Sequence, residues 1–256
     1  MMKTTYKILS FMLMLFLSVS VYAQIPEEIK WEYLKKTYAK DSTALQLTLN
    51  GKSLNGAYKI PLDEDSYALY TIKNGMITGE AFWYTNGGTL ECKLLYKRGV
   101  RNGLKENYDQ NGKVWLRQEF KDGRQDGLSE MYSNGQLNTK SEYKKGKKYG
   151  KQISYSSGKI LSETEYKDNL REGISKTYDF QGNLISEISY KQDRQDGLSV
   201  MYAMGKRNMD FMFVAGKKHG IGHMYKPDGS VIFTSYYLNG EKVSENDYQL
   251  YINDTK

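Results

Sequence analysis

The sequence is poor in the residues that enzymes and metal sites use most often. It contains one cysteine, Cys92, and two histidines, His219 and His223, among 256 residues. A single cysteine excludes an intramolecular disulfide, so stability has to come from packing. Cys92 falls on a position that we predict to face inward on a strand, where a small buried hydrophobic side chain is expected rather than a reactive thiol.

The two histidines do not predict a metal site. Their H-x-x-x-H spacing would place both imidazoles on one face of a helix, but the surrounding residues are predicted to form strands and turns. His219 also occupies a position that holds Asn102, Asp126 and Tyr149 elsewhere in the chain. We therefore expect no metal and no cofactor. No glycine-rich loop leads into a predicted helix, so a phosphate-binding loop is not expected either.

Recurrent carboxylates do not predict an active site. Glu119, Glu142 and Glu165 each precede an aromatic residue at the same position of a repeat described below. A glycosidase needs two carboxyl groups converging in a cleft, whereas these three are spaced along the chain beside lysines and arginines. We interpret them as part of a solvated face with cross-strand ion pairs. The sequence thus predicts a protein that is not an enzyme.

Long apolar runs are also scarce. The one clear example, Ile8 to Val21, follows Lys3 and Lys7 and ends with Val21 and Ala23 at the positions that a signal peptidase recognises. We expect residues 1–23 to be a signal peptide cleaved after Ala23, with no transmembrane span thereafter. Residue 24 is glutamine, so the usual lipid attachment cysteine is missing. The predicted location is periplasmic, secreted or envelope-associated.

Glycine and tyrosine are abundant, with 24 and 23 copies, and they recur at fixed spacing. A first turn position recurs every 23 or 24 residues, at Gly51, Gly75, Gly99, Gly123, Gly146, Asn169, Asp193, Gly216 and Gly240. A period in this range indicates a repeat architecture. The two residues that replace glycine, Asn169 and Asp193, are those that best tolerate positive φ. We predict a left-handed turn residue at this position.

Two further positions complete the repeat. In seven units a second glycine follows the first turn position by four residues, and a tyrosine follows five residues later. No other residue replaces the second glycine, which predicts unusual φ and ψ or a neighbouring ring against the backbone. The structural repeat residues are Gly99, Gly103, Tyr108, Gly123, Gly127, Tyr132, Gly146, Gly150, Tyr155, Asn169, Gly173, Tyr178, Asp193, Gly197, Tyr202, Gly216, Gly220 and Tyr225.

Between the turns the residues alternate, which predicts strands. Leu137, Thr139, Ser141 and Tyr143 share one face, and the intervening polar residues take the other. One such hairpin is too small to be stable alone, so neighbouring hairpins must stack. The predicted fold is all-β: an elongated array of β-hairpin repeats of 23–24 residues that forms a single continuous twisted antiparallel sheet, with a short N-terminal helix cap.

The predicted domain boundaries follow from the repeat. Residues 24–44 are expected to form an N-terminal helical cap, because Pro26 and two acidic residues begin a segment in which Ile29, Tyr33 and Leu34 lie roughly on one side. Residues 45–243 form the repeat domain, with one degenerate and seven regular units. Residues 244–256 are a polar tail that we expect to be frayed.

The repeat unit resembles a known family. Its pattern, Y-x-x-G-x-x-x-G-x-x-x-x-Y-x-x-(x)-G, is similar to the MORN repeat, and "GKKHGIGHMYKPDGS" from Gly216 to Ser230 is the closest copy. Most units lack the second glycine of G-x-G, carrying Lys105, Ser129 or Gln152 instead, which is typical of the shorter bacterial variant. Some members of that group are labelled YwqK-family antitoxins. The resemblance implies a hairpin sheet that contacts proteins, and the antitoxin label implies inhibition of a partner.

Basic residues flank the first turn position in almost every unit and form the predicted binding stripe, although acidic residues dilute it. They are Lys97, Arg98, Arg101, Lys121, Arg124, Lys144, Lys145, Lys147, Lys148, Lys167, Arg171, Lys217 and Lys218. We expect an exported, non-catalytic scaffold module in the cell envelope that binds an unknown protein partner. The alternatives are an antitoxin-like inhibitor that neutralises an effector protein, or a surface module for anionic lipid or envelope polysaccharide. Nucleic acid is not an expected partner, because the net charge of +7 is modest and the protein is predicted to be exported.

Overall fold

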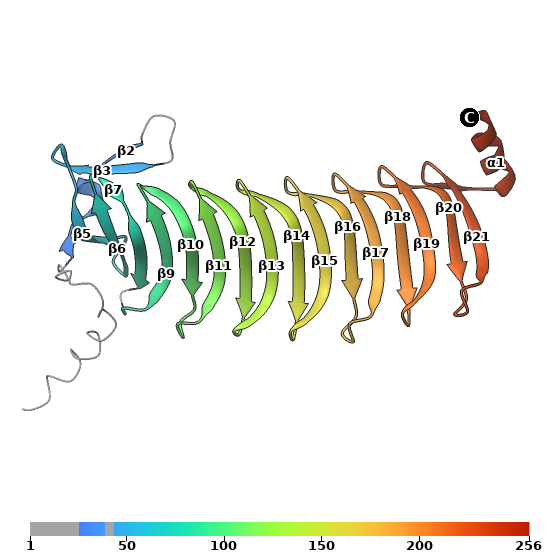
Figure 1. Cartoon of the computed structure of the whole chain (residues 1–256), viewed down its shortest axis with the longest axis horizontal. Coiled ribbons are helices and arrows are strands. Elements are labelled where there is room, and N and C mark those ends of the chain that lie inside the picture. Colours follow the sequence, from blue (N-terminus) through green and yellow to red (C-terminus); the bar gives the residue numbers. More distant parts are fainter. Residues whose placement is uncertain (1–25, 39–43, 86, 256) are drawn as a thin grey trace, which may run out of the picture.

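The chain folds into one long open sheet (Figure 1). The computed structural model describes residues 26–38, 44–85 and 87–255, so the predicted signal peptide lies outside the described residues. These residues contain 22 strands in a single sheet and one α-helix at the C-terminal end. From β8 onward each strand pairs antiparallel with the next strand along the chain, so the hairpins lie side by side along the long axis. The predicted all-β fold, a single long antiparallel sheet of hairpins, is confirmed.

The strands fall into an irregular N-terminal group and a regular array. The N-terminal group consists of β1 (Glu27–Glu28), β2 (Lys35–Tyr38), β3 (Leu45–Leu49), β4 (Lys52–Ser53), β5 (Gly56–Pro61), β6 (Ser66–Lys73), β7 (Met76–Ile77) and β8 (Gly79–Thr85). The array consists of β9 (Leu90–Lys97), β10 (Val100–Tyr108), β11 (Val114–Lys121), β12 (Arg124–Ser133), β13 (Gln136–Lys144), β14 (Lys147–Ser156), β15 (Lys159–Lys167), β16 (Leu170–Tyr178), β17 (Leu184–Lys191), β18 (Arg194–Ala203), β19 (Lys206–Val214), β20 (Lys217–Tyr225), β21 (Val231–Leu238) and β22 (Glu241–Val243). Helix α1 (Glu245–Asp254) follows.

The first turn position lies in a two-residue turn with positive φ at both residues. Asn169 has φ of 75° and Asp193 has φ of 66°, which confirms the predicted left-handed conformation. The residues before them, Asp168 and Gln192, have φ of 54° and 50°. Such turns match the right-handed twist of the flanking strands, because their own backbone twists in the same sense.

The second glycine lies at a bulge next to the turn. Gly127 and Gly173 have φ of 114° and 104°, which glycine adopts without strain. A Cβ atom on Gly127 would overlap the Glu119 side chain, and one on Gly173 would overlap Glu165. The side chain next to each of these glycines therefore belongs to the glutamate that precedes the aromatic residue of the repeat, Phe120 or Tyr166, and not to the aromatic ring itself.

Turn length at the opposite edge explains the alternation between periods of 23 and 24 residues. Two-residue turns occur at Asn134–Gly135 and Ser157–Gly158, where all four residues have positive φ. Longer turns occur at residues 109–113 and 179–183, where the amide of the first residue donates to the carbonyl of the last. Each longer turn adds one residue to the repeat without altering the sheet register.

Among the described residues, the hydrophobic core cluster lies at the N-terminal end. Leu47, Ile60 and Ile72 are fully buried there, together with Leu54 and Tyr70. Within the regular array, the buried positions are few and several are polar, such as Ser141 and Ser199. The array is thus held mainly by its backbone ladder and by half-buried side chains, whereas the first strands form a compact anchor.

The predicted N-terminal helical cap at residues 24–44 is wrong. Its described part forms β1, a short 3-10 helix (Trp31–Tyr33) and β2. Strand β1 pairs in parallel with β5, and β2 pairs antiparallel with β3. Ile29 and Leu34 are buried in the core while Tyr33 is exposed, so these residues do not share one helical face. Tertiary pairing outweighs the weak helical pattern.

The predicted frayed tail at residues 244–256 is also wrong. Ser244 caps α1, because its hydroxyl accepts a hydrogen bond from the Asp247 amide at 3.2 Å. The helix packs against the end of the sheet through Tyr248 on Tyr236, with ring centroids 5.3 Å apart, and through Tyr251 on His219. A serine followed by acidic residues was the helix signal in the sequence.

Candidate functional site: the turn edge and the C-terminal apolar surface

The predicted basic residues lie along one edge of the ribbon, which we call the turn edge (Figure 1). This edge is formed by the two-residue turns at residues 98–99, 122–123, 145–146, 168–169, 192–193 and 215–216, together with the strand residues beside them. The antiparallel pairing places each turn next to the same turn of the neighbouring hairpin.

Hydrogen bonds join each turn to the preceding hairpin. The Gly123 amide donates to the Arg101 carbonyl at 2.9 Å, and the Gly146 amide donates to the Gln125 carbonyl at 2.7 Å. Asn169 and Asp193 repeat the contact, so glycine is not needed for it. These bonds continue along the turn edge as a row perpendicular to the strands, and they fix the spacing of the hairpins there.

The acidic residues that dilute the stripe hold the turns in place. Asp126 accepts a hydrogen bond from the Lys145 amide at 3.0 Å, and Asp196 accepts one from the Ala215 amide at 3.0 Å. Glu172 does the same for the Gln192 amide at 2.9 Å. Each carboxylate lies just before the second glycine and reaches the turn of the next hairpin. Sequence reasoning missed this role, because it depends on contacts between adjacent repeats.

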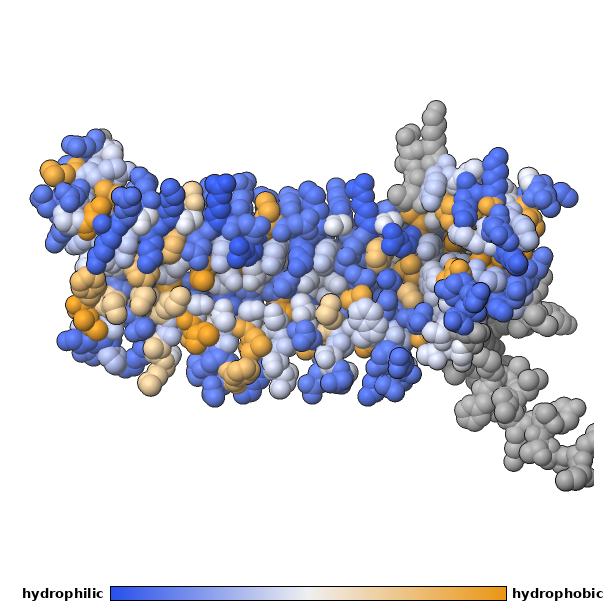
Figure 2. Space-filling model, turned by 180° about the vertical axis from the view of Figure 1, so that it is seen from behind, coloured by the Kyte–Doolittle hydropathy of each residue, from blue (hydrophilic) through white to orange (hydrophobic). Residues whose placement is uncertain are grey.

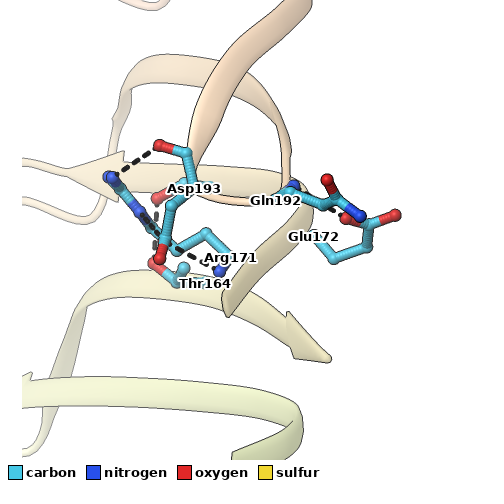
Figure 3. Close-up of polar contacts among 6 residues, drawn as sticks. Thr164, Arg171, Glu172, Gln192 and Asp193 are labelled. Atoms are coloured by element: carbon cyan, nitrogen blue, oxygen red, sulfur yellow. Dashed lines mark hydrogen bonds and ion pairs between the residues drawn. The ribbon is translucent and has the colours of Figure 1, made fainter. Parts of the chain in front are cut away.

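Arg171 is engaged in the same network (Figure 3). Its backbone amide and Nε donate to Asp193 Oδ1 at 2.9 and 3.0 Å, and Nη2 donates to the Asp193 carbonyl at 3.1 Å. The amide of Arg171 and its guanidinium hold the pKa of the Asp193 carboxyl below its ordinary value. The guanidinium also lies 4.0 Å from the centroid of the Tyr190 ring. Arg171 is therefore a connector between hairpins.

Other predicted binding residues stack on rings. Arg101 lies over Phe120 at 5.0 Å, Lys148 over Tyr166 at 5.0 Å, and Lys218 over Phe211 at 3.6 Å. Lys144 lies over Tyr149 at 4.9 Å. Because a cation over an aromatic face is attracted by the ring quadrupole, these side chains also stabilise the sheet.

The remaining predicted residues are exposed on the turn edge. They are Lys97, Arg98, Lys121, Arg124, Lys145, Lys147, Lys167 and Lys217. Three pairs of like charge face each other across a hairpin: Lys121 with Arg124, Lys144 with Lys147, and Lys191 with Arg194. Like charges directly opposite each other destabilise a sheet. Lys147 also pairs with the Asp168 carboxylate at 3.3 Å and Lys144 stacks on Tyr149, whereas Lys121 and Arg124 form no ion pair in the described part of the chain.

A second surface was missed by sequence reasoning. Met201, Met209, Met224 and Phe233 are successive cross-strand partners on β18 to β21. The exposed fractions are 49% for Met201, 39% for Met224 and 47% for Phe233. With the exposed Val231 and Ile232 they make up the C-terminal apolar surface. Figure 2 shows hydrophobic residues gathered toward the C-terminal end of the ribbon, while the turn edge is hydrophilic.

The last long strand completes this surface. Strand β22 pairs only with residues 236–238 of β21, so the first half of β21 has no outer strand partner among the described residues. Strand β21 reads "VIFTSYYL" and carries no charge, whereas β9, β11, β13, β15, β17 and β19 all contain charged residues. Edge strands usually carry charges that prevent further pairing. The absence of charge on β21 is visible in the sequence and could have predicted this surface.

Four of the repeat tyrosines, Tyr108, Tyr132, Tyr202 and Tyr225, donate hydrogen bonds from their hydroxyls to carboxylates. Tyr108 donates to Glu106 at 2.9 Å and Tyr132 donates to Glu130 at 2.9 Å. Burial, followed by the hydrogen bond to Glu106, raises the pKa of Tyr108 to about 12. Tyr225 donates to Asp210, a buried carboxylate that also contacts Arg207. These contacts indicate that the tyrosines of the repeat stabilise the fold.

The two histidines and the cysteine, which were considered above as metal-binding or reactive residues, lie in separate environments. The Nδ1 atom of His219 accepts a hydrogen bond from the Asn239 amide, while His223 contacts Asp210. No group of three or more histidine, cysteine, aspartate or glutamate side chains within residues 26–38, 44–85 and 87–255 has metal-binding geometry. Cys92 is half-buried, with burial raising the pKa of its thiol, and its Sγ contacts Asn107 Oδ1 at 3.7 Å.

The recurrent glutamates differ from the prediction in one respect. Glu119 is not simply part of a solvated face, because its carboxylate accepts a hydrogen bond from the Leu128 amide at 3.0 Å beside the Gly127 bulge. Glu142 and Glu165 lie against the Gly150 and Gly173 bulges in the same way. The absence of Cβ on these glycines leaves room for the carboxylates.

Comparison with protein families identifies the repeat. The model of the MORN repeat variant matches residues 101–122 and 171–192. Each stretch begins just after a turn of the turn edge and includes the second glycine and the tyrosine of the repeat. It ends just after the aromatic residue near the end of the next strand, Phe120 or Tyr190. The chain therefore contains MORN-variant repeats, and the match does not extend to an antitoxin subgroup. The comparison with curated proteins gave no match. Among the described residues, no helix is long and apolar enough to cross a membrane.

Proposed function

We propose that the protein is an exported, non-catalytic scaffold module that binds a partner protein on its C-terminal apolar surface. The observation that carries the proposal is the contiguity of Met201, Met209, Met224 and Phe233 across four strands. Exposed apolar patches of this kind mark protein interaction sites. Methionine side chains are flexible and polarisable, so they adapt to a partner's shape. Export rests on the predicted signal peptide at residues 1–23.

The geometry of β21 suggests how the partner binds. Its first half presents an edge without a strand partner among the described residues, and this half contains Val231 and Ile232, which are 49% and 58% exposed. A partner strand can extend the sheet there, gaining main-chain hydrogen bonds while its apolar side chains contact Phe233 and Met224. The absence of charge on β21 removes the usual barrier to such pairing.

A salt-wash experiment tests the proposal. The immobilised chain from residue 24 onward is incubated with an envelope extract and washed at low and at high salt. We expect a partner protein to be retained at high salt, because apolar contacts are not screened. A Met224→Ser, Phe233→Ser variant should lose it, whereas a Lys121→Ser, Arg124→Ser variant should retain it. Loss with the second variant, and not with the first, would overturn the proposal.

The turn edge supports a second candidate function. Lys121 and Arg124 face each other at a cost to folding stability, and neither forms an ion pair among the described residues, so their presence favours binding of an anionic surface. Anionic lipid headgroups or envelope polysaccharide have the required charge. This candidate predicts co-sedimentation with anionic vesicles that disappears at high salt and in the Lys121→Ser, Arg124→Ser variant. Binding that is equal for neutral vesicles would contradict it.

A further inference from the structure

Two adjoining hollows lie at the junction between the N-terminal core and the array. One has a volume of about 520 Å³ and is lined by Trp31, Tyr70 and Tyr96 among others. The other has a volume of about 540 Å³ and is lined by Trp83, Trp115 and Tyr108 among others. Tyr96 and Arg101 line both. All three tryptophans of the chain therefore lie in this one aromatic groove.

The groove departs from the repeat at several positions. Trp115 occupies a slot that holds Asn138, Leu161 and Ile185 in later hairpins. Lys105 occupies a slot that holds Ser129, Gln152 and Ser175. The later hairpins fold without tryptophan or lysine at these slots, so the repeat itself does not require them. Residues that a repeat does not require, gathered around one hollow, indicate a site.

The polar groups of the groove define the ligand's chemistry. Arg101 and Lys105 both line the second hollow, and neither forms an ion pair with a carboxylate among the described residues. They are available to an anionic group on a ligand, and an arginine guanidinium can bind a carboxylate with two hydrogen bonds. Asn107 and Glu91 line the same hollow and supply acceptors for hydroxyl groups.

The combination favours a sugar that carries a carboxylate. The flat faces of tryptophan and tyrosine pack against the apolar C–H faces of a pyranose ring, while its hydroxyls need acceptors such as Glu91. A nucleic acid would also stack on the rings and present anionic groups to Arg101 and Lys105, so the experiment below includes one as a competing ligand. We propose that the aromatic groove binds acidic sugar residues of a glycan, with Arg101 and Lys105 holding the carboxylate.

Tryptophan fluorescence of the full chain gives a direct test, because every tryptophan lines the groove. The probes are tetrasaccharides of galacturonate, glucuronate and mannuronate, with the neutral galactose, glucose and mannose tetrasaccharides as controls. At least one acidic sugar should change the emission saturably, and its neutral counterpart should bind at least about tenfold more weakly, as expected for the loss of charge-assisted hydrogen bonds. No saturable change with any acidic sugar, or equal affinity for the neutral one, would overturn the inference.

Variants that take their new residue from the equivalent position of a later hairpin separate an effect on binding from an effect on folding. Arg101→Gln and Lys105→Ser introduce the residue types that the next hairpin has at the equivalent positions, Gln125 and Ser129. Each substitution should weaken acidic-sugar binding about tenfold. Trp115→Leu copies Leu161 and should weaken acidic and neutral sugars alike. Lys148→Gln, at the slot of Arg101 two hairpins away, is the matched control and should bind as the unaltered chain does. Stronger quenching by a polyuridylate tetranucleotide than by any sugar would reassign the groove to nucleic acid. The site is remote from the C-terminal apolar surface, so it can fail without affecting the proposed scaffold function.

Discussion

At the scale of single residues, the array depends on two kinds of position with positive φ. Turn glycines such as Gly146 at the turn edge and Gly158 at the opposite edge have open space where a Cβ atom would lie, so only the backbone conformation restricts them. The bulge glycines such as Gly173 have both positive φ and a glutamate side chain in the space a Cβ would take. This difference explains why Asn169 and Asp193 can replace glycine at the turn, while the bulge keeps glycine in every regular unit.

The two glycine positions should therefore differ in their sensitivity to alanine. Gly158→Ala should cost about 1 kcal/mol of unfolding free energy, the penalty for alanine in the left-handed region. Gly173→Ala should cost more, about 2–3 kcal/mol, because Glu165 must also move. Urea denaturation of the two variants measures both values, and equal costs would contradict the role assigned to Glu165.

The Asp193 carboxylate should make stability depend on pH. Its pKa is lowered in the folded state by the Arg171 amide and guanidinium, so the stabilisation is present above the ordinary pKa near 4 and is lost as the pH falls through the lower folded value. Asp193→Asn should remove this contribution. We expect the difference in urea midpoint between the two proteins to shrink from pH 6 to pH 3. A difference that is constant over this range would contradict the assignment.

At the scale of elements, the two ends of the sheet are closed differently. The first strands form a core with Leu47 and Ile60 fully buried, whereas the last long strand is covered over part of its length by β22 and α1. The helix rests on aromatic contacts from Tyr248 and Tyr251. The C-terminal end is thus the less protected end of the ribbon.

Removing the Tyr248 ring should release α1. Tyr248→Ala loses an aromatic pair that contributes about 0.5–1.5 kcal/mol, so hydrogen exchange in β22 and the second half of β21 should accelerate up to about tenfold. Strands β9 to β11 should be unaffected, because each repeat contacts only its neighbours. Leu250→Ala, at an exposed position of the same helix, is the control. Faster exchange throughout the array in Tyr248→Ala would contradict local docking.

The sequence predicted the hairpins well because their signals are local and repeated. Turn residues with positive φ and alternation along the strands act within one unit, as at Asn169 and Tyr143. It failed at residues 24–44, where long-range pairing with β5 and β3 decides the structure. It also failed at α1, where a serine cap and a tyrosine contact outweigh low hydrophobicity.

The candidate sites could be predicted only in part for the same reason. The turn edge follows from the repeat spacing alone, but the function of Asp126 and Asp196 as acceptors for the next turn requires the neighbouring hairpin. The C-terminal apolar surface brings together methionines from different units through strand register. The aromatic groove combines residues from the N-terminal core and the first repeats, which are distant in sequence.

At the scale of the whole molecule, stability is concentrated in the N-terminal core, far along the ribbon from the C-terminal apolar surface. Leu47→Ala in the buried core should cost about 2–5 kcal/mol, because it removes fully buried methyl groups and leaves a cavity. Leu170→Ala in the array, where the side chain is largely exposed, should cost less than about 1 kcal/mol. Urea denaturation gives both values. Similar losses would mean that the N-terminal core is not the anchor of the ribbon.

The long open sheet leaves two chemically distinct surfaces available at once. The turn edge carries exposed cations, and the C-terminal apolar surface carries methionine and phenylalanine. The turn edge should bind through electrostatic attraction, which salt weakens, and the C-terminal apolar surface should bind by burying apolar side chains. Which surface contacts the partner protein is the central question for the proposed function.

Site-specific photo-crosslinking answers this question most directly. A photoreactive residue is placed at Met224 in the C-terminal apolar surface, at Lys121 on the turn edge, or at Phe180 in an exposed loop at the opposite edge as the control. After incubation with the envelope extract and irradiation, our account predicts one crosslinked protein from position 224, at low and at high salt, and none from the other two. A crosslink from position 121 that disappears at high salt, with none from position 224, would contradict it.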